Sequence, residues 1–324
     1  KVIENFYPNS DDNSLFPQFH LSDFSARNRA MVKIQEGCDQ VCSYCIVPKV
    51  RGREKSIPIN QVVNKINTLN DLSYREVVLT GTQLGTYGFD LDHTSIVDLI
   101  SMIIEKTDIP RIRVSSLQPH EITDDLLKLW ENERLCPHFH IPLQSGSDSI
   151  LKNMRRQYSS NTFISSLDNV KSQVSDVAIT TDIIVGFPGE TLEDFKQTQD
   201  ICVRSEFSDL HVFRFSRRPG TSAFYLFDDV TSKEKSSRSS ELISIGKESY
   251  KTFRQAYEGQ KLKVLWEGKK KNDGELTEAN TGLTANYIRV RESNSFATPN
   301  SFSNVIVKMD PVDSYGPMVA FQAN

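Results

Sequence analysis

Three of the five cysteines in this 324-residue chain lie within eight residues of one another. They are Cys38, Cys42 and Cys45, and they follow the pattern Cys-x3-Cys-x2-Cys. Three thiolates on one short loop can bind three irons of a cubane iron–sulfur cluster, whereas full ligation uses four cysteines. The fourth iron is then open to a small chelating ligand, like the free position of a catalytic metal centre. The spacing therefore predicts a catalytic 4Fe–4S cluster held by these three residues.

Two other interpretations of the cysteine loop stay open at this point. A structural zinc site needs four ligands, and no second Cys or His pair follows the loop at ligand spacing. The three thiols could also lie together without any metal. The other two cysteines, Cys136 and Cys202, lie in apolar stretches and are expected to be small buried side chains. An odd number of cysteines disfavours a secreted disulfide scaffold.

Strands and helices must position this loop, and the hydrophobic pattern predicts them in regular alternation. Short apolar runs predict six strands, at 31–34, 76–80, 111–115, 139–143, 177–185 and 209–215. Apolar residues at helical spacing predict helices at 59–69, 95–105, 124–130, 147–154, 162–173 and 192–204. Such alternation forms right-handed βαβ units around a parallel sheet. We therefore expect an α/β fold, a partial (β/α)6 TIM-like barrel whose strand ends carry the site.

The last part of the chain has the pattern of a second, all-β unit. A polar helix is expected over 231–257, and a hairpin signal at 272–274 follows an alternating stretch. Short strands separated by turn residues predict a small five-stranded β-barrel at 257–324. Residues 1–30 show neither helical nor strand periodicity and are expected to be a linker. The unit with the cysteine loop would then span 31–256.

The hydropathy pattern excludes a membrane-spanning protein, and the distribution of charge is compatible with a nucleic-acid substrate. No apolar run approaches the ~18 residues that cross a bilayer. The net charge is −4, yet basic residues gather on predicted loops and helix ends near the strand ends, at Lys49, Arg51, Arg53, Arg155, Arg156, Arg217 and Arg218. They suggest contacts to the phosphates of a polyanionic substrate, and scattered solvated charges are the alternative. In the terminal unit, Arg289 and Tyr287 could supply a phosphate contact and a stacking contact.

The cysteine loop and five further segments resemble one family, the radical S-adenosylmethionine methylthiotransferases. These segments are 48–54, 79–88, 141–148, 182–191 and 211–221. The resemblance implies that S-adenosylmethionine binds the open iron and is cleaved to a 5′-deoxyadenosyl radical, with an electron from a donor such as flavodoxin or ferredoxin. It also implies that 31–256 is a radical SAM domain. The segment 257–324 resembles the family's TRAM domain, an OB-like barrel that binds RNA.

Within the family, three segments look most like one tRNA-modifying branch, namely 80–88, 115–119 and 178–182. That branch adds a methylthio group to C2 of N6-threonylcarbamoyladenosine at position 37, in the tRNA anticodon stem-loop. Branches that act on isopentenyladenosine in tRNA or on a ribosomal-protein aspartate are alternatives. A non-catalytic RNA-binding module is a further interpretation, against which the intact cysteine triad counts. The resemblance implies a cytoplasmic protein, and a monomer is expected.

The resemblance also implies roles for residues in the loops after the strands. Cys38, Cys42, Cys45 and Asp182 would form the catalytic centre, and Tyr44 would lie against the adenine of the cofactor. The other cofactor-binding candidates are Gly81, Thr82, Gln83, Gln144, Ser145, Gly186 and Phe187. Each group has a structural alternative: a tight turn for the glycines, a helix cap for the polar residues, and a structural hydrogen bond for the aspartate. The remaining histidines near this region, His138 and His140, are expected to be structural.

Full-length members of the family carry an upstream domain in which three further cysteines hold a second 4Fe–4S cluster. No cysteine precedes Cys38 in this chain. If the chain is part of such a protein, it is expected to cleave S-adenosylmethionine without inserting sulfur. Formation of methylthio-adenosine by this chain alone would contradict that expectation.

Overall fold

The computed structural model describes residues 28–272 and 275–323. Most of the linker expected at 1–30 lies outside this part of the chain, and so do two residues of the hairpin turn expected at 272–274. The first strand begins at Arg29, two residues earlier than the sequence pattern indicated.

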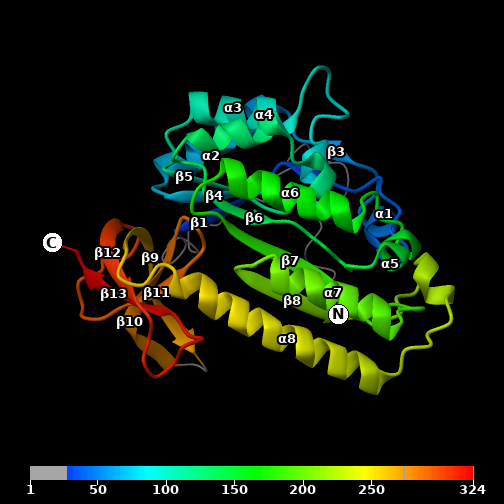
Figure 1. The fold of residues 1–324 in the computed structure, drawn as a ribbon. Coiled ribbons are helices and arrows are strands. Elements are labelled where there is room, and N and C mark those ends of the chain that lie inside the picture. Colours follow the sequence, from blue (N-terminus) through cyan, green and yellow to red (C-terminus); the bar gives the residue numbers. More distant parts are fainter. Residues whose placement is uncertain (1–27, 273–274, 324) are drawn as a thin grey trace.

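Six parallel strands form the larger of two units (Figure 1). They are β1 (Arg29–Lys33), β4 (Glu76–Thr80), β5 (Arg111–Val114), β6 (His138–His140), β7 (Ala178–Val185) and β8 (Asp209–Arg214). They pair in the orders β1-β4-β5 and β6-β7-β8, and parallel bridges from Ile112 to Leu135 and from Ser116 to His140 join the two sheets. Among the described residues β1 does not pair with β8, so the barrel has an open seam there. The predicted partial (β/α)6 barrel is confirmed, and we call it the open barrel.

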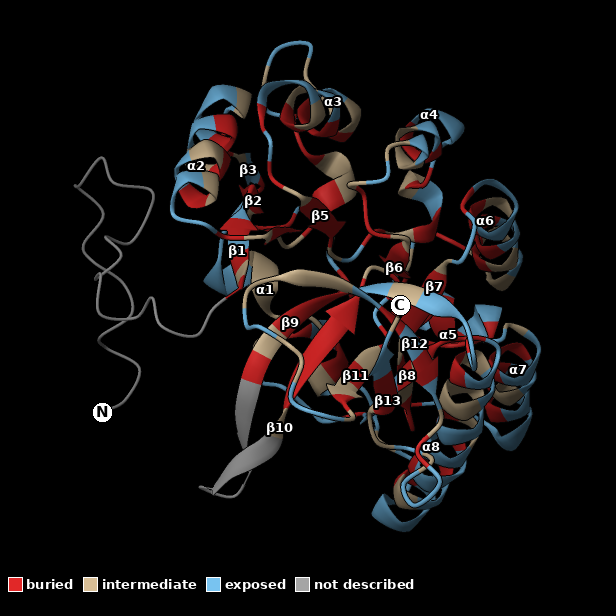
Figure 2. Cartoon of the chain, turned by 90° about the vertical axis from the view of Figure 1, so that its left-hand side faces the viewer, coloured by how far each residue is buried: buried red, intermediate tan, exposed pale blue. Residues whose placement is uncertain are grey.

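Helices alternate with the strands along the chain and bury apolar side chains against them, except the first, which lies in the cysteine loop and has no buried residue. They are α1 (Val47–Val50), α2 (Ile59–Asp71), α3 (Ile96–Lys106), α4 (Asp124–Leu127), α5 (Asp148–Asn153), α6 (Ser160–Gln173), α7 (Leu192–Arg204) and α8 (Ser232–Gln255). Figure 2 shows the buried residues on the strands and on the inward sides of these helices. Capping boxes begin α3, α7 and α8 at Ser95, Thr191 and Thr231, because a hydroxyl and a carboxylate together satisfy free backbone N–H groups of the first turn.

Two predicted elements are shorter in the structure than their sequence pattern suggested. The strand expected at 139–143 ends at His140, two residues before Pro142, which has no N–H to donate to a ladder. The chain stays buried after that point and touches β7 again through a bridge from Gln144 to Ile183. The helix expected at 124–130 becomes α4 followed by a 3₁₀ turn at Lys128–Glu131.

A two-stranded antiparallel pair frames the cysteine loop. It consists of β2 (Gln35–Glu36) and β3 (Lys55–Ser56), which the sequence pattern did not reveal because each strand has two residues. The loop from Gly37 to Glu54 therefore begins and ends at neighbouring residues, because Glu36 of β2 pairs with Lys55 of β3. This pair holds both ends of the loop at the carboxyl end of β1.

The terminal unit is a closed five-stranded barrel, as predicted. Its strands are β9 (Lys261–Asn272), β10 (Glu275–Thr284), β11 (Arg289–Glu292), β12 (Phe302–Lys308) and β13 (Met318–Gln322), in the order β10-β11-β13-β12-β9. Its core contains Val264, Trp266 and Val290, none of them exposed. Closure leaves no unpaired sheet edge, which is the usual solution for a small all-β unit. We call this unit the terminal barrel.

The terminal barrel packs against the amino ends of β1, β4 and β5. Arg111 at the start of β5 donates to the carbonyl oxygens of Leu283 at 2.9 Å and Lys263 at 2.7 Å. Arg113 on the same strand donates to the carbonyl oxygen of Ala285 at 3.0 Å. The terminal barrel therefore lies at the end of the open barrel opposite the cysteine loop, since the loop follows the carboxyl end of β1.

One buried carboxylate organises this junction. Glu76, the first residue of β4, is 0% exposed and pairs with Arg29 at 2.9 Å, Arg113 at 3.1 Å and Arg111 at 3.8 Å. Burial alone would raise the pKa of Glu76, but the charges of Arg113, Arg29 and Arg111 outweigh it and lower that pKa. Arg29 also reaches Glu267 of the terminal barrel at 2.5 Å. The carboxylate thus holds in place the cations that connect the two units.

Candidate active site

The cysteine loop begins at a position that only glycine can occupy. Gly37 has φ +76°, and a Cβ there would lie 1.9 Å from the carbonyl oxygen of Arg53. This close approach brings the two ends of the loop together, and the N–H of Cys38 donates to the carbonyl of Gly52 at 3.2 Å. The first cysteine is therefore placed by backbone geometry rather than by side-chain packing.

The middle of the loop is anchored to two distant parts of the chain. The Ser43 hydroxyl donates to the carbonyl of Asn153 at 2.8 Å, and the Ser43 N–H donates to the carbonyl of Met154 at 2.9 Å. The Ser43 carbonyl in turn accepts the N–H of Ala223, which follows β8, at 2.7 Å. The end of α5 and the segment after β8 thus hold the loop against the carboxyl ends of the strands, which we call the mouth.

The three cysteines of the loop form no disulfide, and their surroundings favour binding of a metal cluster. Cys38 and Cys42 are buried and Cys45 is half-buried. Burial raises the pKa of Cys38 to about 11, so the thiolate form needs a positive partner. Soft thiolate ligands select iron–sulfur clusters, and the iron supplies that positive charge. The donor set therefore fits a three-cysteine cluster.

Arg156 brings a fixed positive charge to the same loop. Its guanidinium donates to the Cys42 sulfur at 3.1 Å and lies 4.9 Å above the ring of Tyr158. It also donates to the side-chain oxygen of Gln118. Arginine stays charged in proteins, so this group favours a thiolate or a carboxylate beside it. The sequence predicts both Arg155 and Arg156 as basic residues near the mouth, and only the structure shows that Arg156 turns inward.

An outer cavity joins the cysteine loop to the carboxyl ends of β6, β7 and β8. It has a volume of about 340 Å³, within the range of small-molecule sites. Six of its lining residues are Tyr44, Cys45, Gln144, Asp182, Ile184 and Arg218. The loop after β6 places Gln144 here with φ +63°. Four predicted site residues, Tyr44, Cys45, Gln144 and Asp182, therefore face one space.

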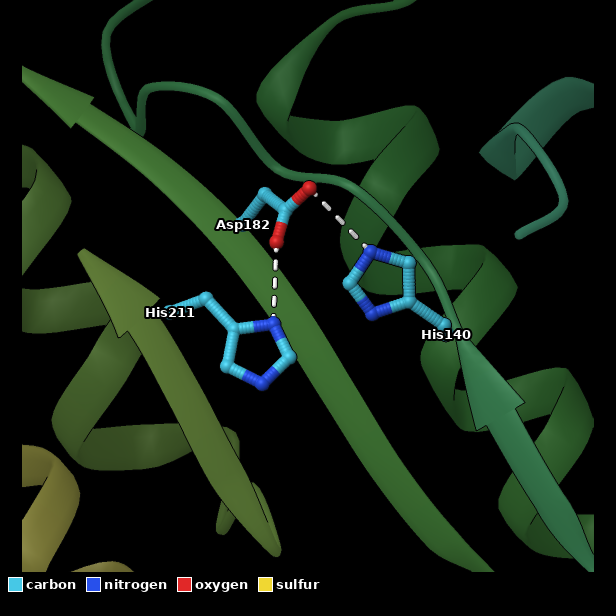
Figure 3. Close-up of side chains that lie close together, drawn as sticks. All are labelled: His140, Asp182 and His211. Carbon is cyan, nitrogen blue, oxygen red and sulfur yellow. Dashed lines mark hydrogen bonds and ion pairs between the residues drawn. The ribbon is translucent and has the colours of Figure 1, made fainter. Parts of the chain in front are cut away.

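Asp182 holds two histidines on the neighbouring strands (Figure 3). Its two carboxylate oxygens lie 3.2 Å from Nε2 of His140 and 3.1 Å from Nδ1 of His211. The other ring nitrogen of His140 lies 2.9 Å from the Thr180 hydroxyl. Burial would raise the pKa of Asp182, but the hydrogen bonds from His140 and His211 lower it well below its usual range. Asp182 is thus an ionised carboxylate fixed between two imidazoles, from three adjacent strands.

These three side chains are also a set that could hold a divalent metal. Their ligand atoms all lie within 4.8 Å of one another. Two histidines and one carboxylate form a common coordination set in proteins. Each carboxylate oxygen already accepts one ring N–H, however, so the arrangement is satisfied as a hydrogen-bonded trio. His140, which the sequence analysis expected to be structural, belongs to this site because it ends a parallel strand at the mouth.

Some predicted cofactor contacts lie away from the outer cavity. Phe187 is 0% exposed and packs in a cluster with Ile150 and Met154. Ser145 is 1% exposed, and its hydroxyl accepts the N–H of Ser147 at 3.2 Å. The side chains of Phe187 and Ser145 therefore support the loops at the mouth, and the predicted role of these residues in cofactor binding stays a prediction. The N–H of Gly186 donates to the Glu190 carboxylate at 3.0 Å, which fixes the turn after β7.

The loop after β4 is held by one buried amide side chain. The Gln35 side-chain oxygen accepts the N–H of Thr82 at 2.9 Å and that of Gln83 at 3.0 Å. A Cβ on Gly81 would meet the side chains of Leu84 and Gln35, so the packing here leaves no room for a larger residue. The Gln83 side-chain oxygen lies 3.9 Å from the Cys38 sulfur. The loop thus contacts the cysteines directly, and its predicted role in cofactor binding stays a prediction.

Five of the predicted phosphate-contacting residues lie on two segments beside the mouth. Lys49, Arg51, Arg53, Arg217 and Arg218 are exposed on the segments before β3 and after β8. A Cβ on Gly220 would lie 4.0 Å from the Lys49 side chain, so these two segments touch, and Arg218 lines the outer cavity. Arg289 lies instead on the terminal barrel and pairs with Glu267 at 2.9 Å. The structure therefore places five basic residues of the open barrel on two neighbouring segments and Arg289 on the other unit.

Comparison with known proteins defines the class of this barrel. The model of the Radical SAM superfamily matches residues 32–202, which include all three cysteines of the loop. The chain belongs to the radical SAM superfamily, whose enzymes use a 4Fe–4S cluster and S-adenosylmethionine. The 4Fe–4S cluster and S-adenosylmethionine expected from the sequence are therefore the cofactors of the superfamily to which the chain belongs.

Curated relatives of this chain are methylthiotransferases with two different substrates in their names. The chain is 36% identical to a threonylcarbamoyladenosine tRNA methylthiotransferase (MtaB) of Bacillus subtilis over 85% of its length and 61% of that relative. It is 39% identical to the MtaB of Thermotoga maritima, over 75% of the chain and 56% of the relative. It is 37% identical to a tRNA-2-methylthio-N(6)-dimethylallyladenosine synthase of Clostridium tetani, over 78% of the chain and 56% of the relative. The chain thus spans 56–61% of the length of these relatives.

Solved structures share the fold. The chain resembles the radical S-adenosylmethionine methyltransferase TsrM of Kitasatospora setae, with a TM-score of 0.51 and 15% identity over 60% of this chain and 38% of that one. It also resembles the coproporphyrinogen III oxidase HemN of Escherichia coli, with a TM-score of 0.50 and 16% identity over 70% of this chain and 55% of that one. Both likenesses concern the fold alone. Within the described residues, no helix combines the length and apolar character needed to cross a bilayer.

Proposed function

We propose that this chain carries the radical SAM part of a tRNA methylthiotransferase acting on N6-threonylcarbamoyladenosine at position 37. The observation that carries the proposal is the three-thiol loop at the mouth, with Arg156 beside Cys42 and Tyr44 and Cys45 on the outer cavity. The relatives named above support the methylthiotransferase class. When bound, the cluster and S-adenosylmethionine supply radical chemistry at an otherwise unreactive C–H bond.

The residues around the outer cavity would bind and orient the cofactor. Cys38, Cys42 and Cys45 would hold the cluster, and the positive charge of Arg156, which lies beside Cys42, would attract the carboxylate of the cofactor. Tyr44 offers its ring to the adenine, and Gln144 offers an amide to the ribose. The backbone segments after β4 and β7, at 81–83 and 186–187, would close the remaining sides of this cofactor site. Fixed groups of this kind position the reacting atoms and exclude water.

The exposed basic residues at the mouth would contact the phosphates of the anticodon stem-loop. Their charges lie beside the outer cavity, whereas the net charge of the whole chain is −4, so the attraction is local. The terminal barrel would be a TRAM domain at 257–324 that binds RNA through Arg289, whereas the ring of Tyr287 already stacks on His138 and under Arg113. Residues 31–256 would be the radical SAM domain. A monomer in the cytoplasm, reduced by a flavodoxin or a ferredoxin, completes the proposal.

The choice among tRNA substrates rests on three segments, 80–88, 115–119 and 178–182, that resemble the threonylcarbamoyladenosine branch. Relatives of both tRNA kinds match at similar identity, 36% and 37%, so overall similarity does not separate them. We also propose that sulfur insertion needs a second 4Fe–4S cluster on an upstream domain of the whole protein.

Mass spectrometry of nucleosides tests this function directly. The chain is incubated anaerobically with S-adenosylmethionine, dithionite and tRNA that carries N6-threonylcarbamoyladenosine, alone and joined to an upstream cluster domain. We expect 5′-deoxyadenosine from both samples and 2-methylthio product only from the second. Product on isopentenyladenosine tRNA but not on threonylcarbamoyladenosine tRNA would overturn the substrate assignment.

A further inference from the structure

A second cavity lies inside the open barrel, on the other side of Asp182 from the cysteine loop. This inner cavity has a volume of about 360 Å³ and contains no residue of the cysteine loop. Its polar side chains include Ser115, Ser116, His138, His140 and His211. Met31 of β1, which is 65% exposed, and the half-exposed His211 of β8 line it from the two sides of the open seam. A ligand can therefore enter it from the side and meet the outer cavity at Asp182.

His138 at the deep end of the inner cavity has unused hydrogen-bonding capacity. It is 8% exposed, and neither ring nitrogen has a partner among the described residues. Burial, together with the charge of Arg113, lowers its pKa well below the usual value, so the ring is neutral. A neutral imidazole has one donor and one acceptor, and leaving a buried polar group unpaired costs about 1–3 kcal/mol. The ring is fixed by stacking on Tyr287 at 4.3 Å between centroids.

The shallow end of the inner cavity is also polar and rigid. Asp182 fixes the rings of His140 and His211 through the contacts shown in Figure 3. The second nitrogen of His140 is used by Thr180, whereas Nε2 of His211 is not used by Asp182. Hydrogen bonding to Asp182 raises the pKa of His211, so this ring favours its charged, donating form. An anionic group in the cavity would find a donor here and another at His138. The cavity is also lined by the carboxylates of Asp182 and Asp209 and by the guanidinium groups of Arg29 and Arg113.

We infer that the inner cavity binds the substituent on the reacting nucleobase and selects a hydrogen-bonding, carboxylate-bearing substituent over an apolar one. The inference rests on the proposed function. A threonylcarbamoyl group has a carboxylate, a hydroxyl and a urea that can pair with His138 and His211. An isopentenyl group has no such atoms, so it would exclude water from the His138 ring nitrogens and leave both without a hydrogen-bond partner. A site that forms hydrogen bonds to a substrate group strongly rejects analogues that lack this group.

The geometry also explains how one base could use both cavities. Asp182 lines both, so a purine beside it can direct its ring toward Cys45 and Tyr44 and its substituent toward His138. The specificity-determining residues are then His138 at the deep end and His211 at the seam. Neither touches the cysteine loop, so cofactor binding and substrate selection can be measured separately.

Binding of synthetic anticodon stem-loops tests this inference without turnover. Stem-loops with threonylcarbamoyladenosine, isopentenyladenosine or unmodified adenosine at position 37 are titrated into the reconstituted chain, and the Kd values come from fluorescence anisotropy. We expect the threonylcarbamoyl loop to bind about 10-fold more tightly than the isopentenyl loop, a difference of about 1.4 kcal/mol. In His138→Leu the two Kd values should become equal, through weaker binding of the threonylcarbamoyl loop.

Two further variants keep the result interpretable. His138→Gln retains a donor and an acceptor and should keep most of the preference, which also excludes a general folding defect. His93→Asn, on the exposed turn before α3, should leave both Kd values unchanged. Equal Kd values for the wild-type chain, or a preference that survives His138→Leu, would overturn the inference. Failure of the proposed function would look different, because then no stem-loop binds or no 5′-deoxyadenosine forms.

Discussion

Arg156 shows how one side chain outside the cysteine loop can set the chemistry inside it. Its guanidinium reaches Cys42 from the segment after α5, at 3.1 Å, and lies on the ring of Tyr158. The adjacent Arg155 is exposed. Hydrogen bonds that involve a charged group contribute about 1.5–3 kcal/mol each, so the two neighbouring arginines should differ strongly in function.

We therefore predict that Arg156→Gln weakens binding of S-adenosylmethionine by about 10- to 100-fold, from the loss of one charged pair. Equilibrium dialysis of the reconstituted chain measures the Kd. Arg155→Gln is the matched control and should bind the cofactor like the wild type. Equal affinities of the two variants would show that the charge of Arg156 does not act on the cofactor.

The loops after β6 and β7 illustrate what sequence patterns can and cannot show about a site. The strands and helices of the open barrel could be predicted from hydrophobic periodicity, because burial imposes it, and the cysteine spacing is read directly from the sequence. The outward or inward direction of a loop side chain depends instead on contacts from elsewhere in the chain. The side chains of Ser145 and Phe187 are buried beside the outer cavity, and His140 is hydrogen-bonded to Asp182. No local pattern distinguishes these outcomes, since the partners come from neighbouring strands.

At Gly146 the loop after β6 lies directly against the backbone of α7. A Cβ there would lie 2.6 Å from the Cα of Thr198 in α7, and backbone cannot yield as a flexible side chain can. We predict that Gly146→Ala lowers the free energy of unfolding by about 1–3 kcal/mol, as overpacking does, and reduces cofactor binding through Gln144. Thermal unfolding and dialysis measure the two effects.

Gly246→Ala in α8 is the control for this substitution. Its Cβ would meet only the Leu210 side chain, at 3.1 Å, and alanine gains about 1 kcal/mol of helix propensity over glycine. We expect little change in stability and none in cofactor binding. A larger loss for Gly246→Ala than for Gly146→Ala would contradict this account of the loop.

At the scale of the whole molecule, the two barrels are joined through a buried charge cluster. Glu76 lies among Arg29, Arg111 and Arg113, and these cations reach the terminal barrel. Removing one partner of a buried ion pair leaves uncompensated charge and costs about 3–5 kcal/mol. Sequence alone could predict both barrels, but their junction depends on residues about 170 positions apart, such as Arg111 and Leu283, which no local periodicity links.

We predict that Glu76→Gln destabilises the chain by about 3–5 kcal/mol and loosens the terminal barrel. Chemical denaturation gives the free energy, and hydrogen exchange at 283–285 reports the junction. Glu36→Gln removes the exposed pair with Lys33 and should cost at most about 1 kcal/mol. Equal effects of both substitutions would mean that the cluster does not hold the units together.

Acid should weaken the same junction. The pKa of Glu76 is lowered in the folded chain, so its pairs stabilise the protein at neutral pH. That stability is lost as the pH falls below the unfolded glutamate value of about 4.3 and approaches the lower folded value. We predict that the stability curve of Glu76→Gln is flatter than that of the wild type below this pH. Parallel curves would assign acid sensitivity to other carboxylates.

The central claim is that the three-cysteine loop holds a cluster that cleaves S-adenosylmethionine. The most direct measurement combines iron and sulfide analysis of the anaerobically reconstituted chain with its 5′-deoxyadenosine yield in dithionite. We predict about four irons per chain and product formation, both lost in Cys42→Ala and both kept in Cys202→Ala, whose thiol is buried away from the loop. Iron and 5′-deoxyadenosine that persist in Cys42→Ala would contradict the account.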